Sequence, residues 1–251
     1  MPVTQTLDIK EKMKRFLSYS IFFILGTGAG WILSGKHWNI FFTSYVPALA
    51  TLLAAFFGAK YAFQFQNEKE ERQHKEKNIL NGNLAIFDLM RMANTLLAYR
   101  KQIIDPFREK STAFLEMPPS LNLLENDINF NAENLFFLLQ SGEVNFIGKL
   151  VVENRKFQST LNAINDRSKI HRFEVQPTLE KAGIVQGGDY TFQQIEDILG
   201  DRLHVTIQQA TQQVITSVDE TIDSLKNAGD NLSKILKKTF PGEQIINFKF
   251  E

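Results

Sequence analysis

The stretch GTGAGWILSGKH, from Gly26 to His37, is the first pattern in the sequence that could do chemistry. Its second half spells G-x-x-x-x-G-K, which is most of a P-loop. In a P-loop, backbone N–H groups wrap a phosphate, and a Ser or Thr after the lysine binds the metal ion. Here His37 follows Lys36, Trp31 fills the loop interior, and an apolar run replaces the polar helix that should come next. The sequence therefore predicts no nucleotide site at this position.

The aspartate that would help such a loop to hold magnesium is not found downstream either. Asp88 ends the run LAIFD, which looks at first like an apolar strand. The apolar residues around it recur every three or four positions, which is typical of a helix. They are Leu80, Leu84, Phe87, Met90, Ala93 and Leu97. We expect Asp88 to lie beside this stripe and to face solvent.

The other residue types that do chemistry are scattered along the chain. The sequence contains no cysteine, which excludes disulfides, thiolate metal sites and cysteine nucleophiles. The four histidines are His37, His74, His171 and His204. They form no H-E-x-x-H or other spacing suited to a metal, so we expect each of them at the surface. With no G-x-S-x-G and no kinase signature present, we expect no catalytic residue, no metal site and no cofactor.

One polar connection is the best place in the sequence for a partner protein to dock. It is the segment DPFREKSTAFLEMPP, which holds Asp105, Arg108 and Glu116. The alternative is an ordinary polar connection between two helices. Nucleic acid is not an expected partner, because residues 60–251 carry 23 basic against 26 acidic side chains, whereas nucleic-acid binders usually show a basic surplus.

Two long apolar segments lie near the start of the chain, before the helices that carry the polar residues described above. Phe16–Gly35 contains 20 residues and Trp38–Ala59 contains 22, all without a formal charge. About 20 such residues are needed for a helix to cross the hydrocarbon of a bilayer. Together the segments predict a transmembrane helical hairpin over residues 16–59, in contact with membrane lipid. A signal peptide and a buried hairpin in a soluble core are the alternatives, but the paired length and the absence of a cleavage site favour the membrane.

The charges that flank the two segments predict their orientation. Four basic residues precede the first segment, and five follow the second between Lys60 and Lys77, whereas the turn holds only Lys36. By the positive-inside rule, both termini then lie in the cytoplasm, with the chain passing twice through the membrane.

Small residues recur every four positions in both segments. Gly26, Gly30 and Ser34 do so in the first, and Ala50, Ala54 and Gly58 do so in the second. Such ridges let membrane helices approach closely and gain van der Waals contact. They could pack within one hairpin or between protomers, which makes a homo-oligomer an expectation.

The rest of the chain predicts only helices, so the expected fold is all-α. We divide it into a cytoplasmic N-terminus (1–15), the hairpin (16–59), a stalk helix (60–104) and a cytoplasmic helical domain (105–251), a bundle with coiled-coil character. Further helices are expected over Ala132–Gln140, Glu143 to about Phe173, Thr191 to about Asn227, and Leu232–Phe240. Pro177 is expected in a connection, and the tail GEQIINFKFE as a lone extended strand.

This layout of a short N-terminus, two close membrane spans and a helical cytoplasmic domain resembles the small two-span membrane effectors of bacterial antiviral defence systems of the retron type. The paired apolar segments carry the resemblance. It implies a non-enzymatic protein that partners keep silent, among them a reverse transcriptase complex. On infection, release would let the spans assemble through the ridges of small residues and perturb the inner membrane. The alternative function is a passive membrane anchor or scaffold whose helical domain recruits a partner.

Overall fold

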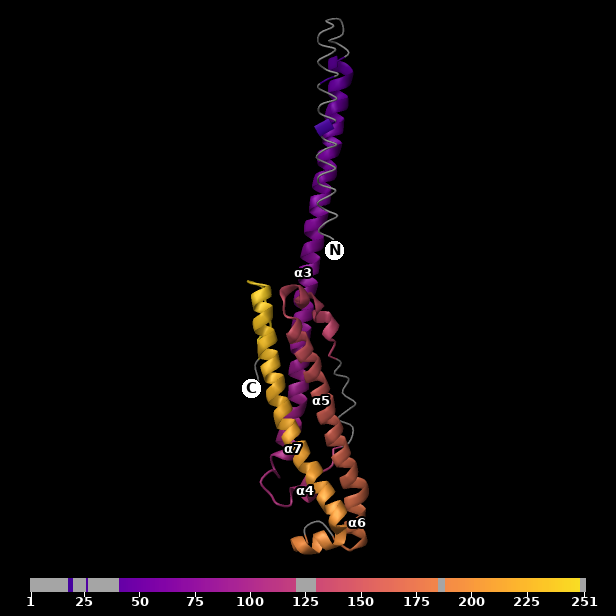
Figure 1. Ribbon diagram of the computed structural model, residues 1–251, viewed down its shortest axis with the longest axis vertical. Coiled ribbons are helices and arrows are strands. Elements are labelled where there is room, and N and C mark those ends of the chain that lie inside the picture. The colour runs from indigo at the N-terminus through magenta and orange to yellow at the C-terminus, as the bar shows by residue number, and fades with distance from the viewer. Residues whose placement is uncertain (1–17, 20–25, 27–40, 121–129, 185–187, 249–251) are drawn as a thin grey trace. The chain divides into compact units, whose positions relative to one another are not determined.

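A computed structural model describes residues 18, 19, 26, 41–120, 130–184 and 188–248 of the chain. These described residues are helical or irregular and contain no β-strand (Figure 1). The all-α prediction is confirmed for them. Most of the first apolar segment, with Gly30, Ser34 and the phosphate-loop pattern, lies outside the described residues.

The helical elements divide between two compact units, Met1–Glu71 and Arg72–Glu251. Their order is η1 (Phe41–Tyr45, π-helical), α3 (Val46–Tyr99), η2 (Arg100–Ile104, π-helical), α4 (Ala113–Glu116), η4 (Ala132–Ser141, 3₁₀), α5 (Val144–Ile170), η5 (His171–Val175, π-helical), α6 (Gln176–Lys181) and α7 (Phe192–Thr239). Helix α3 belongs to both units, so helical backbone joins them.

In the first unit, the described residues are chiefly η1 and the first half of α3. The helical stretch Thr43–Ile104 is the one described helix that is long and apolar enough to cross a membrane, and none of its most apolar part is buried. The charged stretch that follows, from Asn67 to Lys77, is exposed as expected.

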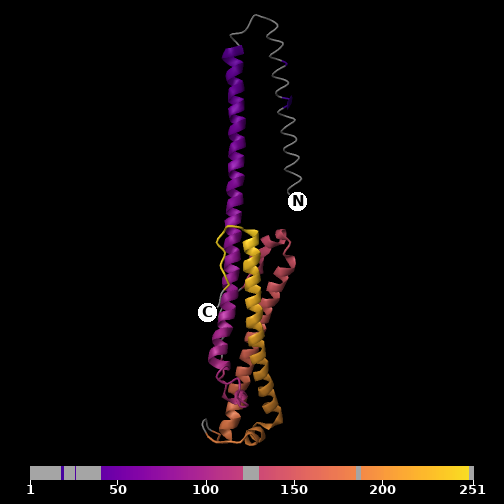
Figure 2. The same ribbon diagram turned by 90° about the vertical axis from the view of Figure 1, so that its left-hand side faces the viewer.

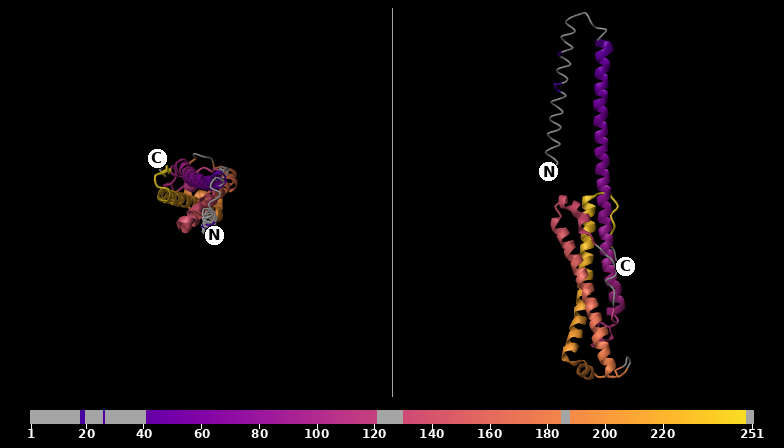
Figure 3. Two further views of the ribbon diagram at one scale, coloured as in Figure 1. Left: turned by 90° about the horizontal axis from the view of Figure 1, so that it is seen from above. Right: turned by 90° about the vertical axis from the view of Figure 1, so that its right-hand side faces the viewer.

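In the second unit, α3, α5 and α7 contribute to one hydrophobic core. Helix α7 lies beside α5 and runs in the opposite direction (Figures 1 and 2), and the views in Figure 3 agree. The core includes Leu89 and Met92 of α3, Phe157 of α5, and Val218 and Leu225 of α7. A smaller cluster joins α4, η5 and the start of α7.

Helix α7 is longer than its sequence pattern predicted. Five residues of the predicted stripe are fully buried, namely Ile207, Val214, Val218, Ile222 and Leu225, which confirms the predicted face. The helix starts with a capping box formed by Thr191 and Gln194 and does not end near Asn227 but continues to Thr239. The break lies near its start instead, at Gly200, whose φ of 70° and ψ of 155° are open almost only to glycine.

Two other sequence predictions are wrong in detail. Pro177 does not lie in a connection, because it stands in the first turn of α6. The π-helical turn η5 leads directly into that first turn. On α3 the helix is correct, but the first half of the apolar stripe is not buried: Leu80, Leu84 and Phe87 are 58%, 48% and 51% exposed. Ala93 of the stripe is buried, and Met90 and Leu97 pack against the core. The rest of the buried face comes from Ala85, Ile86, Leu89, Met92, Leu96 and Tyr99.

Candidate functional site

The exposed apolar part of α3 is the most unusual surface among the described residues. Leu52, Leu53 and Phe57 are 59%, 44% and 46% exposed. A contiguous apolar surface of this kind needs lipid or another protein to cover it. Ala50, Ala54 and Gly58 of the predicted ridge are exposed too, and a Cβ added at Gly26 or Gly58 would meet nothing within 4 Å. Packing of another helix against this ridge therefore remains a prediction.

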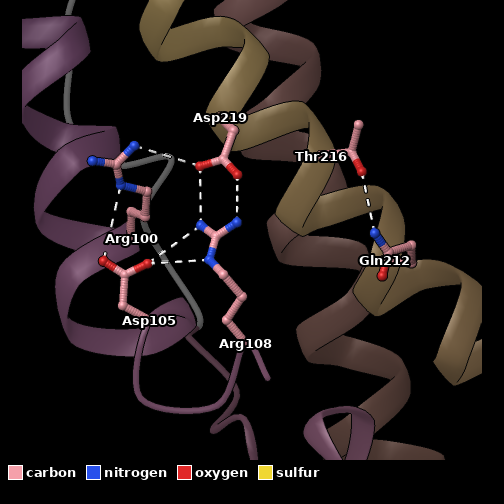
Figure 4. A network of polar contacts seen from close by, with 6 residues as sticks. All are labelled: Arg100, Asp105, Arg108, Gln212, Thr216 and Asp219. Carbon is pink, nitrogen blue, oxygen red and sulfur yellow. Dashed lines mark hydrogen bonds and ion pairs between the residues drawn. The ribbon is translucent and has the colours of Figure 1, made fainter. Parts of the chain in front are cut away.

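Two of the three predicted docking residues belong to a network of four charged side chains (Figure 4). Arg108 donates through Nη1 to Asp219 Oδ2 at 2.6 Å and through Nη2 to Asp219 Oδ1 at 3.0 Å. Its Nε and Nη2 also reach Asp105 Oδ1, at 3.4 and 3.3 Å. Arg100 completes the network at 3.5 Å from Asp219 Oδ1 and 4.0 Å from Asp105 Oδ2. The network ties the connection after η2 to the middle of α7.

The network is electrostatically balanced, with two guanidinium groups alternating with two carboxylates. Its strongest contact is the paired one between Arg108 and Asp219, and this hydrogen bonding lowers the pKa of Asp219 below its ordinary value and raises that of Arg108. The side chains of Arg100, Arg108 and Asp219 are 28%, 30% and 33% exposed, so solvent screens them only in part. On the outer face of α7, Gln212 donates to Thr216 at 3.4 Å and takes no part in the network (Figure 4).

Glu116, the third predicted docking residue, lies in a separate local cluster. Lys110 Nζ donates to Glu116 Oε2 at 2.5 Å, and the Thr112 hydroxyl donates to the other carboxylate oxygen. These hydrogen bonds lower the pKa of Glu116. The structure thus brings Asp105 and Arg108 together but does not place Glu116 with them, and their role in docking stays a prediction.

A buried arginine forms a second polar centre that the sequence reading missed. Arg167 of α5 is fully buried. It donates to Thr211 Oγ1 at 3.3 Å and to the carbonyl oxygens of Pro118 and Phe114 at 3.2 and 3.1 Å. Among the described residues no carboxylate forms an ion pair with it. Burial lowers its pKa to about 10, so the group still carries its charge at neutral pH.

Two buried groups near this arginine have unpartnered polar atoms. The Tyr99 hydroxyl makes no hydrogen bond, and burial raises its pKa to about 12. His171 donates from Nε2 to the Leu115 carbonyl at 2.9 Å, while its Nδ1 has no hydrogen-bond partner. Burial lowers the pKa of His171, which favours the neutral ring.

The prediction of surface histidines is therefore wrong for His171 and His204, which are 5% and 3% exposed. The His204 ring contacts Phe114 and Phe192 edge to face, with centroids 5.2 and 5.1 Å away. Its Nε2 accepts from the Gln208 amide at 3.0 Å, and its Nδ1 lies 3.3 Å from Glu196 Oε1 without a hydrogen bond to it.

Asp88 also differs from its prediction, because it is half-buried instead of facing solvent. Burial raises its pKa, and Arg91, at 3.8 Å, opposes that shift. Among the residues that the structure describes, no three His, Asp or Glu side chains gather closely enough to hold a metal ion.

Comparison with known proteins gives no relative from which a function could be transferred: no family model, no curated protein and no solved structure matches this chain.

Proposed function

We propose that the chain is a membrane-anchored, non-enzymatic effector that acts on the bilayer through its apolar N-terminal segments. The observation that carries the proposal is the exposed apolar half of α3, from Val46 to about Phe65. The same helix supplies Leu89, Met92 and Leu96 to the core of the second unit. A membrane-compatible segment is thus joined by helical backbone to a folded domain.

In this proposal, α3 is the second arm of a hairpin that crosses a bacterial inner membrane twice, with both termini in the cytoplasm. The basic residues on either side of the two apolar segments support this orientation. The second unit is then a cytoplasmic helical bundle. Protomers assemble through Gly26, Gly30 and Ser34 in one arm and Ala50, Ala54 and Gly58 in the other, where small side chains permit close contact in lipid.

We further propose antiviral defence as the setting, on the strength of the two-span layout that retron-type effectors share. Partner proteins, a reverse transcriptase complex among them, would hold the chain silent through its cytoplasmic domain. Their release would permit assembly of the spans and loss of the membrane barrier.

The test is to express the full chain alone from an inducible promoter and to follow membrane potential with a voltage-sensitive dye. We expect depolarisation and growth arrest. Gly58→Leu should weaken both, because the larger side chain separates helices that pack through the small ridge. Phe56→Leu, on a different face of the same helix turn, is the matched control and should behave as wild type at equal membrane abundance.

Normal growth and an unchanged potential at full abundance would count against the effector and for the second candidate, a passive anchor or scaffold. One observation favours that candidate: the second unit exposes Leu80, Leu84 and Phe87 along one face of α3, a surface suited to a protein partner. Turnover of a nucleotide by the purified chain would contradict both non-enzymatic proposals.

A further inference from the structure

Residues 243–248 pack on the helices of the second unit much as a peptide ligand packs on a receptor. They follow the turn at Pro241 and Gly242 and run non-helically beside α3 (Figure 2). They form no strand pair among the described residues, so side chains of α3 and α7 satisfy their backbone instead. We call the residues that hold this tail, Asn83 of α3 with Gly229 and Ser233 of α7, the tail-docking surface.

Asn83 binds the backbone of the tail with both ends of its side-chain amide. Its Nδ2 donates to the Gln244 carbonyl at 3.1 Å, and its Oδ1 accepts from the Ile246 N–H at 3.0 Å. In an extended chain, the C=O of one residue and the N–H of the second residue after it point to the same side. The Ser233 hydroxyl adds a third backbone contact, donating to the Ile246 carbonyl at 2.9 Å. Backbone contacts of this kind give affinity without requiring a particular sequence.

Two side chains of the tail give the contact its selectivity. Ile245 and Phe248 are 9% and 7% exposed and belong to the main hydrophobic core. A Cβ built at Gly229 would overlap the Phe248 ring, so only glycine leaves room for an aromatic residue there. The surface therefore holds an aliphatic residue followed three positions later by an aromatic one.

The rest of the tail is held only at its edge. Glu243 accepts from Lys75 Nζ at 2.6 Å, and Lys237 donates to the side chain of Asn247, both as exposed pairs. Exposed pairs add little to stability. The two buried side chains and the three backbone hydrogen bonds must therefore offset the entropy of ordering the whole segment.

We propose that the tail-docking surface is a peptide-binding site, which the chain's own tail occupies in the resting protein. Its second occupant is an extended segment of a partner protein with an aliphatic residue and, three positions later, an aromatic one. Binding of that segment displaces residues 243–248. The proposal is independent of what the membrane segments do, since it concerns only the second unit.

The test uses the full chain in detergent micelles and a fluorescein-labelled peptide with the sequence of Pro241–Phe248. The double variant Ile245→Asp with Phe248→Asp removes both buried side chains of the tail and leaves the surface unchanged. We expect this tail-open variant to bind the peptide saturably in fluorescence anisotropy. Wild type should bind the peptide at least about tenfold more weakly, which is the factor expected when the tail leaves the surface free in about a tenth of the molecules or fewer.

Two further variants of the tail-open chain locate the binding site. Gly229→Ala places a Cβ where the aromatic ring must lie and should reduce affinity by about tenfold or more. Asp230→Ala changes the adjacent, exposed residue and should leave affinity unchanged. A peptide with Asp in place of both apolar residues should not bind.

Three results would overturn the proposal. The first is a tail-open variant that keeps wild-type helicity and melting temperature but binds no peptide. The second is equal binding by wild type and by the tail-open variant, which would mean that the tail does not occupy the site. The third is loss of the folded state in the tail-open variant, which would make the tail a permanent part of the core.

Discussion

Replacing Asp219 by Asn tests whether the charged network of Arg100, Asp105, Arg108 and Asp219 braces the second unit. The substitution keeps the shape of the side chain but removes the charge that accepts both hydrogen bonds from Arg108, at 2.6 and 3.0 Å. It also leaves Arg100 and Arg108 with one carboxylate between them. Charge-assisted bonds contribute about 1.5–3 kcal/mol when buried, and exposed ion pairs about 0.2–1 kcal/mol.

With side chains about one-third exposed, the network falls between these limits. We expect Asp219→Asn to lower the free energy of unfolding by about 1.5 kcal/mol. Asp105→Asn is the matched control within the same network. Its contacts are longer, at 3.3 to 4.0 Å, and its side chain is 44% exposed, so the expected loss is about 0.5 kcal/mol or less.

Urea unfolding of the full chain in detergent, followed by far-UV circular dichroism, measures both losses. Asp219→Asn should shift the midpoint by about 0.5–1 M. Because the pKa of Asp219 is lowered in the folded state, its contribution is fully present above the ordinary aspartate pKa of 3.8 and is lost as the pH falls through the folded value. The variant should therefore lose less stability than wild type below about pH 4.

If neither substitution shifts the midpoint, the brace is refuted, and Asp105 and Arg108 would be available for the docking role that their sequence context predicts. If Asp105→Asn costs as much as Asp219→Asn, the paired contact between Arg108 and Asp219 is not the strongest one in the network.

Three further predictions concern buried polar groups and glycines. Thr160 donates to the Lys156 carbonyl, so in its 2.9 Å contact with Thr221 the Thr221 hydroxyl must be the donor. Thr160→Val leaves that donor without an acceptor and should lower the free energy of unfolding by about 1–3 kcal/mol, whereas Thr221→Val should lower it by about 1 kcal/mol or less and the double variant by less than Thr160→Val alone. Additive losses in urea unfolding would contradict this assignment. Burial lowers the pKa of His171, so the stability of the fold should fall as the pH drops below about 6.5. His171→Gln should flatten the dependence of melting temperature on pH between about pH 5 and 8. An equally steep dependence in the variant would exclude His171 as its cause. Gly200→Ala should lower the free energy of unfolding by about 1–3 kcal/mol, because alanine is strained at the positive φ of this position. Gly148→Ala should raise the free energy of unfolding by about 0.5–1 kcal/mol, because Gly148 lies in helix α5 and an added Cβ would meet nothing within 4 Å. A change of the same sign in both variants would refute the backbone explanation.

The segment Asn81–Gly82–Asn83 shows how far sequence reasoning reached. Its composition is typical of a turn, but helix α3 runs through it. A Cβ at Gly82 would stand 2.7 Å from Leu236, and Asn83 holds the tail. Both partners are more than 150 positions away along the chain, and no local pattern reports a contact of that separation.

Part of the buried face of α3, two members of the charged network and Arg167 were missed for a related reason. Helical spacing fitted two overlapping apolar sets equally well, and only the packing of α5 and α7 decided which residues are buried. The residues 100, 167 and 219 each look like ordinary surface charges on a helix. A weak signal existed for Asp219, since it directly follows Val218 of the predicted apolar stripe.

The sequence by itself determined the elements: apolar runs of membrane-spanning length, helices marked by three-and-four spacing, and the end of the α3 helical run before Asp105 and Pro106. These follow from local physics, because transfer into lipid and helical periodicity depend on residues close together in the chain. The tertiary structure decided which face of α3 is buried, which charges pair across helices, that two histidines are buried, and that the tail docks against Asn83 and Gly229. These depend on contacts between distant residues, whose energies exist only once the helices have packed against one another.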